Sequence, residues 1–260
     1  MDRYLLTGLA LFLCGIAASA QSYVEKARFN APDAKQAVAV DASHFYAITN
    51  TRITKYTMQG DSLMTWQEDD KEKVRHLNSG IVLGHRLYCA NSNFPLYPMA
   101  SSVEVFDTRT LRHIESIPFG IDTGSCTWVL PGKRCWYVFF AHYDKTDKTT
   151  GEVIDNSNLA QLVQYDRKWR RMHAWILPSR LLEEIRPASL SGAVLIGDTF
   201  YCTGHDAPKC HLLRIPDTGF TLEWIGDIDV PFYGQGIARG RDGDLWGIIR
   251  SESAVVRSTR

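Results

Sequence analysis

Histidines and short polar clusters that follow apolar segments are the residues of this chain that could carry chemistry. The stretch GDTFYCTGHDAPKCHLLRIPD, residues 197–217, places His205 and Asp206 between two cysteines. One interpretation is a turn in which Asp206 accepts backbone N–H groups ahead of Pro208. The other is a catalytic pair in which a carboxylate orients His205 for acid or base chemistry. The sequence leaves both open.

A second candidate catalytic residue is His142, in the stretch AHYD. His142 and Asp144 are two residues apart, so at the end of a strand their side chains point the same way. A packing role for His142 is equally compatible with this pattern. Three histidines from separate segments, His76, His142 and His205, together with Asp144 or Asp206, are the candidate ligands of a divalent metal ion with an open position for water.

Five cysteines follow the first twenty residues: Cys89, Cys126, Cys135, Cys202 and Cys210. None has the paired CxxC spacing of a zinc site, and the odd number leaves at least one thiol free. Cys202 and Cys210 flank the loop that carries His205, at roughly opposing positions of a hairpin. We therefore predict a disulfide between them. Cys89 and Cys126 lie within apolar strands, which favours a place in the core over a nucleophilic role.

These residues all lie within a repeated pattern of hairpins. Five segments share an apolar strand, a tight turn and an aromatic-centred strand: KQAVAVDASHFYAITNT, NSGIVLGHRLYCANSN, CTWVLPGKRCWYVFFAHYD, SGAVLIGDTFYCTGHD and GQGIARGRDGDLWGIIRS. A second hairpin follows four of them. Short strands at regular spacing in a recurring unit indicate an all-β fold, and specifically a β-propeller. We predict five four-stranded blades, with SYVEKARF closing the last one; six blades would require the long third unit to be split.

The propeller architecture sorts the polar residues in space. The loops after the second strand of each blade and the segments that lead into the first strand share one face. Candidate ligand-binding residues on this face are Asn78, Asn91, Asn93, Trp128, Asp144, Ser191, Gln235 and Arg250. The opposite face receives turns such as LPGK, IGDT and GRDGD, which are ordinary hairpin turns.

The first twenty residues, MDRYLLTGLALFLCGIAASA, have the layout of a secretory signal peptide. We predict cleavage after Ala20, export to the periplasm or medium, and a single propeller domain over residues 21–260. No other apolar run is long enough to span a membrane.

The composition is that of an ordinary globular protein, 45% hydrophobic with a formal net charge of zero. Nucleic acid and anionic membranes are disfavoured as partners, because both usually require a basic surface. The expected partner is a small polar molecule or a glycan. The oligomeric state is left open.

A resemblance to a known family covers residues 42–238. The segments ASHFYAITNTRITKY, HLNSG, SSVEVFDTRTL, GSCTW, TGHD and GQGIA resemble exported bacterial β-propeller proteins without a settled activity, some of them labelled cycloisomerase. More distantly, the chain is similar to propeller lactonases and sugar-acting hydrolases. That similarity implies a site at the channel mouth built from carboxylates, Asn and His, often with a metal. The chain departs from the calcium-dependent lactonases, since Ser, Asn and His outnumber Asp and Glu on the expected face.

Two classes of function follow from these observations. The first is an exported hydrolase or lactone-type isomerase acting on a small polar or sugar-derived substrate, with His205, His142 and Asp206 as acid, base or metal ligands. The second is a non-catalytic module that binds a glycan or a protein through the same face. Propellers host both, so the fold does not decide whether the chain is an enzyme.

Overall fold

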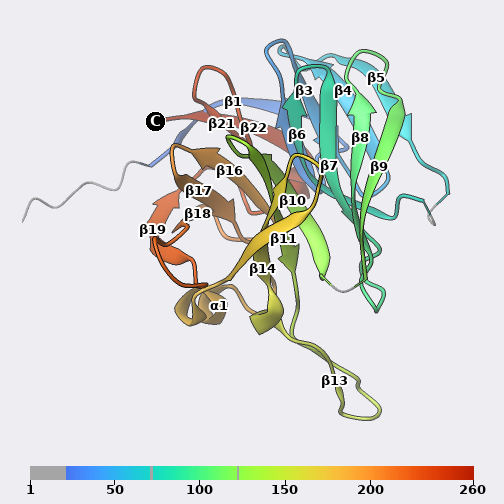
Figure 1. Cartoon of the computed structure of the whole chain (residues 1–260). Coiled ribbons are helices and arrows are strands. Elements are labelled where there is room, and N and C mark those ends of the chain that lie inside the picture. The colour runs from blue at the N-terminus through green and yellow to red at the C-terminus, as the bar shows by residue number, and fades with distance from the viewer. Residues whose placement is uncertain (1–21, 71–72, 122) are drawn as a thin grey trace, which may run out of the picture.

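The computed structural model describes residues 22–70, 73–121 and 123–260. The predicted signal peptide lies outside these residues. The chain forms a five-bladed β-propeller, in which five four-stranded antiparallel sheets surround a central channel (Figure 1). The predicted fold class and blade number are therefore confirmed, and the six-bladed alternative is wrong.

Each blade runs outward from the channel in strand order. The first is β2 (Ala37–Val40), β3 (His44–Ile48), β4 (Arg52–Thr57) and β5 (Ser62–Gln67). The second is β6 (His76–Leu83), β7 (Arg86–Ser92), β8 (Ser101–Asp107) and β9 (His113–Gly120). The third is β10 (Ser125–Pro131), β11 (Cys135–Ala141), β14 (Gln161–Asp166) and β15 (Arg171–Ile176). The fourth is β16 (Gly192–Ile196), β17 (Thr199–Thr203), β18 (Lys209–Arg214) and β19 (Glu223–Asp229).

The fifth blade joins the two ends of the described chain. It contains β20 (Ala238–Arg239), β21 (Leu245–Ile249) and β22 (Ala254–Thr259), with β1 (Val24–Asn30) as the outermost strand. The register of β1 on β22 runs from Val24 opposite Thr259 to Asn30 opposite Ala254. Figure 1 shows this closure as a blue strand beside red ones. The predicted role of SYVEKARF is confirmed.

Alternating side chains in each blade serve the two neighbouring blades, because successive residues of a strand point to opposite faces. In β3, Phe45 and Ala47 pack toward the fifth blade, whereas Tyr46 and Ile48 pack toward the second. The buried apolar residues accordingly form five clusters, one at each interface between blades. This two-sided burial explains why the inner strands read as nearly continuous apolar runs.

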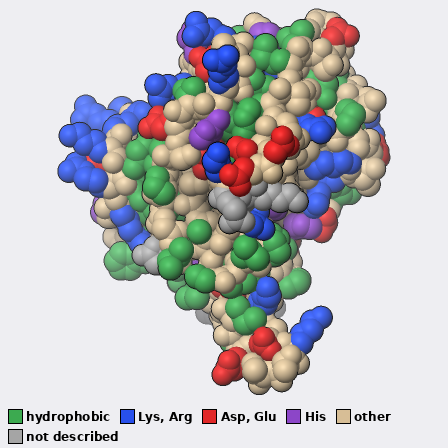
Figure 2. All heavy atoms as spheres, turned by 90° about the vertical axis from the view of Figure 1, so that its right-hand side faces the viewer, with side chains coloured by type: hydrophobic (Ala, Val, Ile, Leu, Met, Phe, Trp, Pro, Cys, Tyr) green, Lys and Arg blue, Asp and Glu red, His purple; other side chains and the backbone are tan. Residues whose placement is uncertain are grey.

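The two faces of the propeller differ in what they carry. The connection face, on the lower side of Figure 1, carries the links between blades and the loops between second and third strands. It includes α1 (Ser179–Ile185) and a projecting hairpin, β12 (Lys145–Thr146) and β13 (Val153–Asp155). Figure 2 shows this hairpin extending beyond the body, with charged side chains at its tip. The hairpin face carries the tight turns, where Gly84 and Gly197 adopt φ of 61° and 65°.

The predicted disulfide between Cys202 and Cys210 is wrong. Cys202 pairs with His211 and Cys210 pairs with Thr203, so the two cysteines are one position out of register and point to opposite faces of the fourth blade. Cys202 packs against the third blade and Cys210 against the fifth. All five cysteines of the described chain are free and buried, and burial raises the pKa of the thiols of Cys89 and Cys126.

No helix in the described part of the chain is both long enough and apolar enough to cross a membrane.

Candidate functional site at the connection-face mouth

The connection-face mouth of the channel brings together His76, His205, Asp206 and Arg250. His76 begins the innermost strand β6, and the loop between β17 and β18 carries His205 and Asp206. Arg250 begins the short helical turn η2 (Arg250–Glu252), which directly follows β21. Three different blades therefore supply these side chains, although up to 174 positions of sequence separate them.

The His205 side chain is oriented by its neighbour. Nδ1 of His205 lies 2.5 Å from a carboxylate oxygen of Asp206, and Nε2 lies 3.4 Å from Nη1 of Arg250. A guanidinium only donates hydrogen bonds, so Nε2 accepts and Nδ1 carries the proton that Asp206 accepts. His205 is thereby held in the tautomer whose lone pair is at Nε2, where Arg250 donates to it, and this lone pair can serve as a general base once a ligand engages the guanidinium.

The loop that carries His205 is fixed from the fifth blade. Gln235, which adopts a φ of 64°, donates its backbone N–H to the carbonyl of Gly204. Its side-chain amide donates to the carbonyl of His205 at 3.2 Å. Gly234 lies directly against this loop, since a Cβ there would approach the His205 carbonyl oxygen to 2.1 Å. Gln235, predicted to bind a ligand, instead positions the loop.

His76 is a neutral histidine at the same mouth. Its backbone N–H donates to Asn91 Oδ1 at 3.2 Å, and its ring lies 5.2 Å from the ring of Phe94. Burial, and secondly the positive charge of Arg250, lower the pKa of His76 to about 4. No hydrogen bond joins its ring nitrogens to another described residue, so a lone pair stays available at neutral pH.

This depressed pKa predicts an acid-sensitive stability. In the unfolded chain His76 takes up a proton near its ordinary pKa of 6.5, whereas in the folded protein it does so only near 4. Stability should therefore fall as pH drops from 6.5 to 4, by up to about 3 kcal/mol, because the unfolded state binds the proton first. Urea unfolding at pH 7 and pH 4.5 measures this loss. His76→Gln should reduce it, whereas His85→Gln, in the exposed turn between β6 and β7, should retain it; equal losses in both variants would refute the assignment.

Arg250 is a half-buried cation without an acidic partner in the described structure. It forms no ion pair there, and its carbonyl accepts a hydrogen bond from a second cation, Lys35, at 3.0 Å. A hollow of about 380 Å³ opens beside its side chain. The lining is Asp206, Tyr233, Ile249, Arg250 and Ser251. Such an unpaired guanidinium at a concave surface favours an anionic ligand group, which it can bind through two parallel hydrogen bonds.

His142, predicted as a catalytic residue and metal ligand, is engaged in structural contacts. Its Nδ1 lies 2.7 Å from Asp155 Oδ1, and its Nε2 lies 3.1 Å from the carbonyl oxygen of Thr123. Asp155 also accepts the backbone N–H of Tyr143 at 2.8 Å. Since both ring nitrogens face oxygen acceptors, His142 anchors the base of the projecting hairpin and presents no free lone pair to a substrate.

Other predicted ligand-binding residues also prove to have structural contacts. Asn91 binds the His76 backbone and donates to Ser102 Oγ at 3.0 Å, whereas Asn93 closes its own loop through Pro98 and Ala100. The carboxylate of Asp144 accepts from the backbone and hydroxyl of Ser157.

The predicted stacking surface Trp128 is inaccessible to a ligand. It is 1% exposed and stacked on Phe139 at 5.3 Å between the third and fourth blades. Asn78 and Ser191 are likewise buried, but Asn78 Oδ1 lacks a hydrogen-bond partner. A buried amide oxygen without a partner is costly, so Asn78 stays a candidate for contact with a ligand or an ordered water.

The three predicted metal-ligand histidines do not form a metal-binding group in the described residues. The one group there with suitably spaced ligand atoms is Glu184, His211 and Asp227, at the outer edge of the fourth blade. The ammonium group of Lys209 already pairs with the carboxylates of Glu184 and Asp227, at 2.9 and 3.3 Å. Lys209 therefore supplies the positive charge that a metal ion would bring to this group. Both ring nitrogens of His142 face oxygen atoms of Asp155 and Thr123, so His142 does not join His76 and His205 in such a group.

Comparison with known proteins supports the fold and no more. No protein-family model matches the sequence, and no curated protein matches it. Among solved structures, the glutaminyl cyclase of Myxococcus xanthus is similar with a TM-score of 0.59, at 10% identity over 92% of this chain and 96% of that one. The WD40 repeats of RRP9 give a TM-score of 0.47 at 12% identity, over 86% of this chain and 79% of that one. The chain is thus a five-bladed β-propeller similar in structure to a bacterial glutaminyl cyclase.

Sequence reasoning missed Tyr233, which is 48% exposed in the hollow beside Arg250. The signal was present in PFYGQG, where an aromatic residue precedes the segment that leads into an inner strand. An exposed aromatic ring beside polar groups is a typical surface for stacking a sugar or another ring.

Proposed function

We propose that the protein is an exported β-propeller that binds a small, carboxylate-bearing, sugar-derived molecule at the connection-face mouth. The single observation that carries this proposal is the unpaired guanidinium of Arg250 in a hollow beside His205. A ligand carboxylate would pair with Arg250, and the ring of Tyr233 would cover an apolar face of the sugar. The predicted export agrees with such a ligand being met outside the cytoplasm.

The reaction that this arrangement supports best is hydrolysis or isomerisation of a lactone. A carboxylate held by Arg250 lies next to Nε2 of His205, so the reacting part of the ligand comes within reach of the base. His205 would take a proton from water or from a ligand carbon or hydroxyl, and Asp206 would stabilise the resulting imidazolium. The Myxococcus protein is named for a ring-forming reaction of a glutaminyl group, so a glutaminyl peptide is a second substrate to test.

The test uses the purified full chain and two measurements. Calorimetric titration compares glucuronate with glucose, which lacks the carboxylate. NMR follows a glucarolactone, which keeps one free carboxylate beside its lactone ring, for ring opening and a glutaminyl dipeptide for ring closure. Arg250→Gln should weaken glucuronate binding about 10- to 100-fold, because hydrogen bonds to a charged group are worth about 1.5–3 kcal/mol. Arg86→Gln, an exposed arginine at the start of β7, is the matched control and should bind as the wild type.

His205→Ala separates the enzyme from the binding module. It should abolish turnover while it leaves glucuronate affinity within a few-fold, since the carboxylate is held by Arg250. Binding without turnover of the lactone or of the dipeptide would favour the non-catalytic alternative, a module for glycans or proteins. Equal affinity for glucuronate and glucose, unchanged in Arg250→Gln, would refute the proposed carboxylate site.

A further inference from the structure

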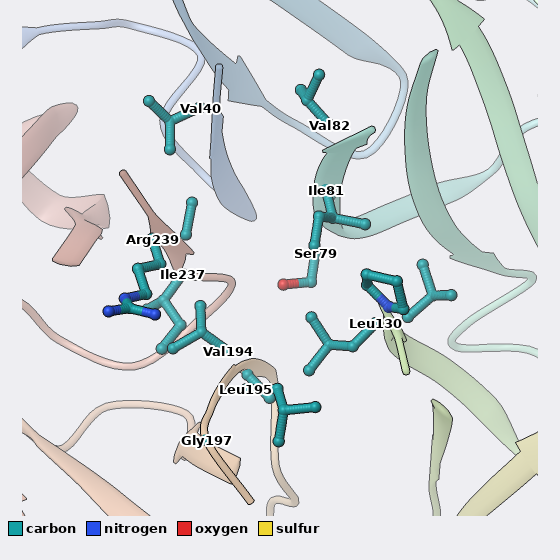
Figure 3. A pocket seen from close by; sticks show the side chains of 15 residues that line it. Val40, Ser79, Ile81, Val82, Leu130, Val194, Leu195, Gly197, Ile237 and Arg239 are labelled. Carbon is teal, nitrogen blue, oxygen red and sulfur yellow. The ribbon is translucent and has the colours of Figure 1, made fainter. Parts of the chain in front are cut away.

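A separate cavity of about 270 Å³ opens at the other end of the channel, on the hairpin face. Only ordinary hairpin turns were expected there. All five innermost strands contribute to its lining, in which most side chains are apolar and the strand backbones add polar groups (Figure 3). The apolar side chains include Val40, Val82, Leu130, Leu195 and Ile237. A concave site that combines apolar side chains with a few polar groups is the usual form of a small-molecule pocket, and this volume lies just below the usual range, so it suits only a small ligand.

A serine hydroxyl points into this cavity. Ser79 is 3% exposed, and its hydroxyl forms no hydrogen bond with any residue in the described ranges. Figure 3 shows it directed toward the middle of the cavity. Its position results from the irregular register of β6 between Leu77 and Gly80, where the strand passes the centre of the channel. Because this hydroxyl faces the cavity, a ligand or an ordered water can complete its hydrogen bonds.

A guanidinium lies at the rim of the same cavity. Arg239, in β20, is exposed and lines the opening (Figure 3). It forms no ion pair with any acidic residue that the structure describes. The nearby carboxylates of Asp242 and Asp244 already bind Arg257, and Asp244 also binds Lys26 at 2.9 Å. The positive charge of Arg239 is therefore available to pair with an anionic group of a ligand.

The two ends of the channel are separated by close packing at its middle. Ala37 and Gly236 bridge the first and fifth blades in parallel, and a Cβ on Gly236 would approach the Ala37 Cβ to 2.4 Å and Ser79 Oγ to 2.7 Å. A Cβ on Gly192 would approach the Gln235 carbonyl to 2.5 Å. Without free space between these backbones, a ligand at the hairpin face cannot also reach Arg250.

We propose that this cavity is a second binding site, for a small carboxylate with an unbranched apolar body, such as a short-chain fatty acid. The alkyl chain loses contact with water among the apolar side chains of the inner strands. The carboxylate pairs with Arg239 at the rim, where it stays partly hydrated. Within the cavity, Ser79 supplies a single hydrogen bond, which an ordered water or a polar atom of the ligand takes up.

The test is calorimetric titration of the full chain with hexanoate, and with hexanol as the neutral counterpart. Hexanoate should bind saturably, and hexanol about tenfold more weakly, because it lacks the charge that Arg239 pairs with. Arg239→Gln should lower hexanoate affinity about tenfold, to that of hexanol. Arg241→Gln, an exposed arginine in the following turn, is the matched control and should bind hexanoate as the wild type. Val82→Trp, which places a large ring in the cavity, should abolish binding of both.

The outcomes separate this site from the one at the connection face. Arg250→Gln should leave hexanoate binding unchanged, and loss of hexanoate binding in that variant would place the fatty acid at the other mouth and overturn the proposal. Absence of saturable hexanoate binding to the wild type would also overturn it, as would equal effects of Arg239→Gln and Arg241→Gln. None of these results depends on whether glucuronate binds.

Discussion

A chain that lacks residues 22–30 is expected to lose its folded state. Deletion removes β1 and leaves β22 as an open sheet edge. It also removes Phe29, whose ring lies 5.1 Å from that of Phe45 and 5.7 Å from that of Trp246, and Tyr23, which is 5% exposed. Burial of two aromatic side chains is worth about 4 kcal/mol, before the strand pairing is counted, and a domain of ordinary stability has about 5–15 kcal/mol in total.

Circular dichroism and urea unfolding of the truncated chain measure this effect, with two substitutions as controls. Phe29→Ala alone should cost about 2 kcal/mol, because the ring is half-buried at the interface of the fifth and first blades. Val24→Ala, on the same strand but 57% exposed, should change stability by less than about 0.5 kcal/mol. A synthetic peptide of residues 22–30 should restore the fold of the truncated chain. A truncated chain as stable as the full one would show that β1 does not close the ring.

The propeller could be predicted from local patterns because each blade repeats the same chemistry. Short apolar segments at regular spacing indicated the strands, and glycines such as Gly84 and Gly197 indicated the turns between them. The missing fourth strand of the last unit indicated that the N-terminal segment pairs with the C-terminal one. Register was beyond such reasoning. Cys202 and Cys210 looked opposed, but a shift of one residue between β17 and β18 sends them to different faces.

The location of the candidate site could be predicted from the sequence, whereas the contacts of its individual side chains could not. His205, Asp206 and Arg250 were each expected on one face, and the structure brings them together. The contacts of His142 and Trp128 depend on strand register and loop geometry that the sequence does not reveal. Asp155 lies on a hairpin that has no counterpart in the other blades, and Phe139, paired with Trp128 on the next strand, covers one face of the indole. The sequence also carried no sign that Ser79 and Arg239 would share a cavity.

Addition of one methyl group at the middle of the channel is expected to destabilise the whole propeller. In Gly192→Ala the new Cβ would lie 2.5 Å from the Gln235 carbonyl oxygen and 2.6 Å from Gly236 Cα. These are backbone atoms of the neighbouring blade, so relief requires the fourth and fifth blades to move apart. We expect a loss of at least about 3 kcal/mol in the free energy of unfolding, measured with urea. Glucuronate and hexanoate should both bind more weakly, because Gln235 positions the His205 loop and Ile237 lines the hairpin-face cavity.

Gly204→Ala is the matched control, since it makes the same chemical change in the loop between β17 and β18. The nearest atom to a Cβ there is His211 Nε2 at 3.8 Å, an ordinary contact. Its free energy of unfolding should change by less than about 1 kcal/mol, with a bias toward stabilisation because alanine restricts the unfolded chain. If Gly192→Ala and Gly204→Ala both unfold at the same urea concentration as the wild type, the inner strands of the fourth and fifth blades have room to move apart. The channel would then be open between its two mouths, and one ligand could occupy both.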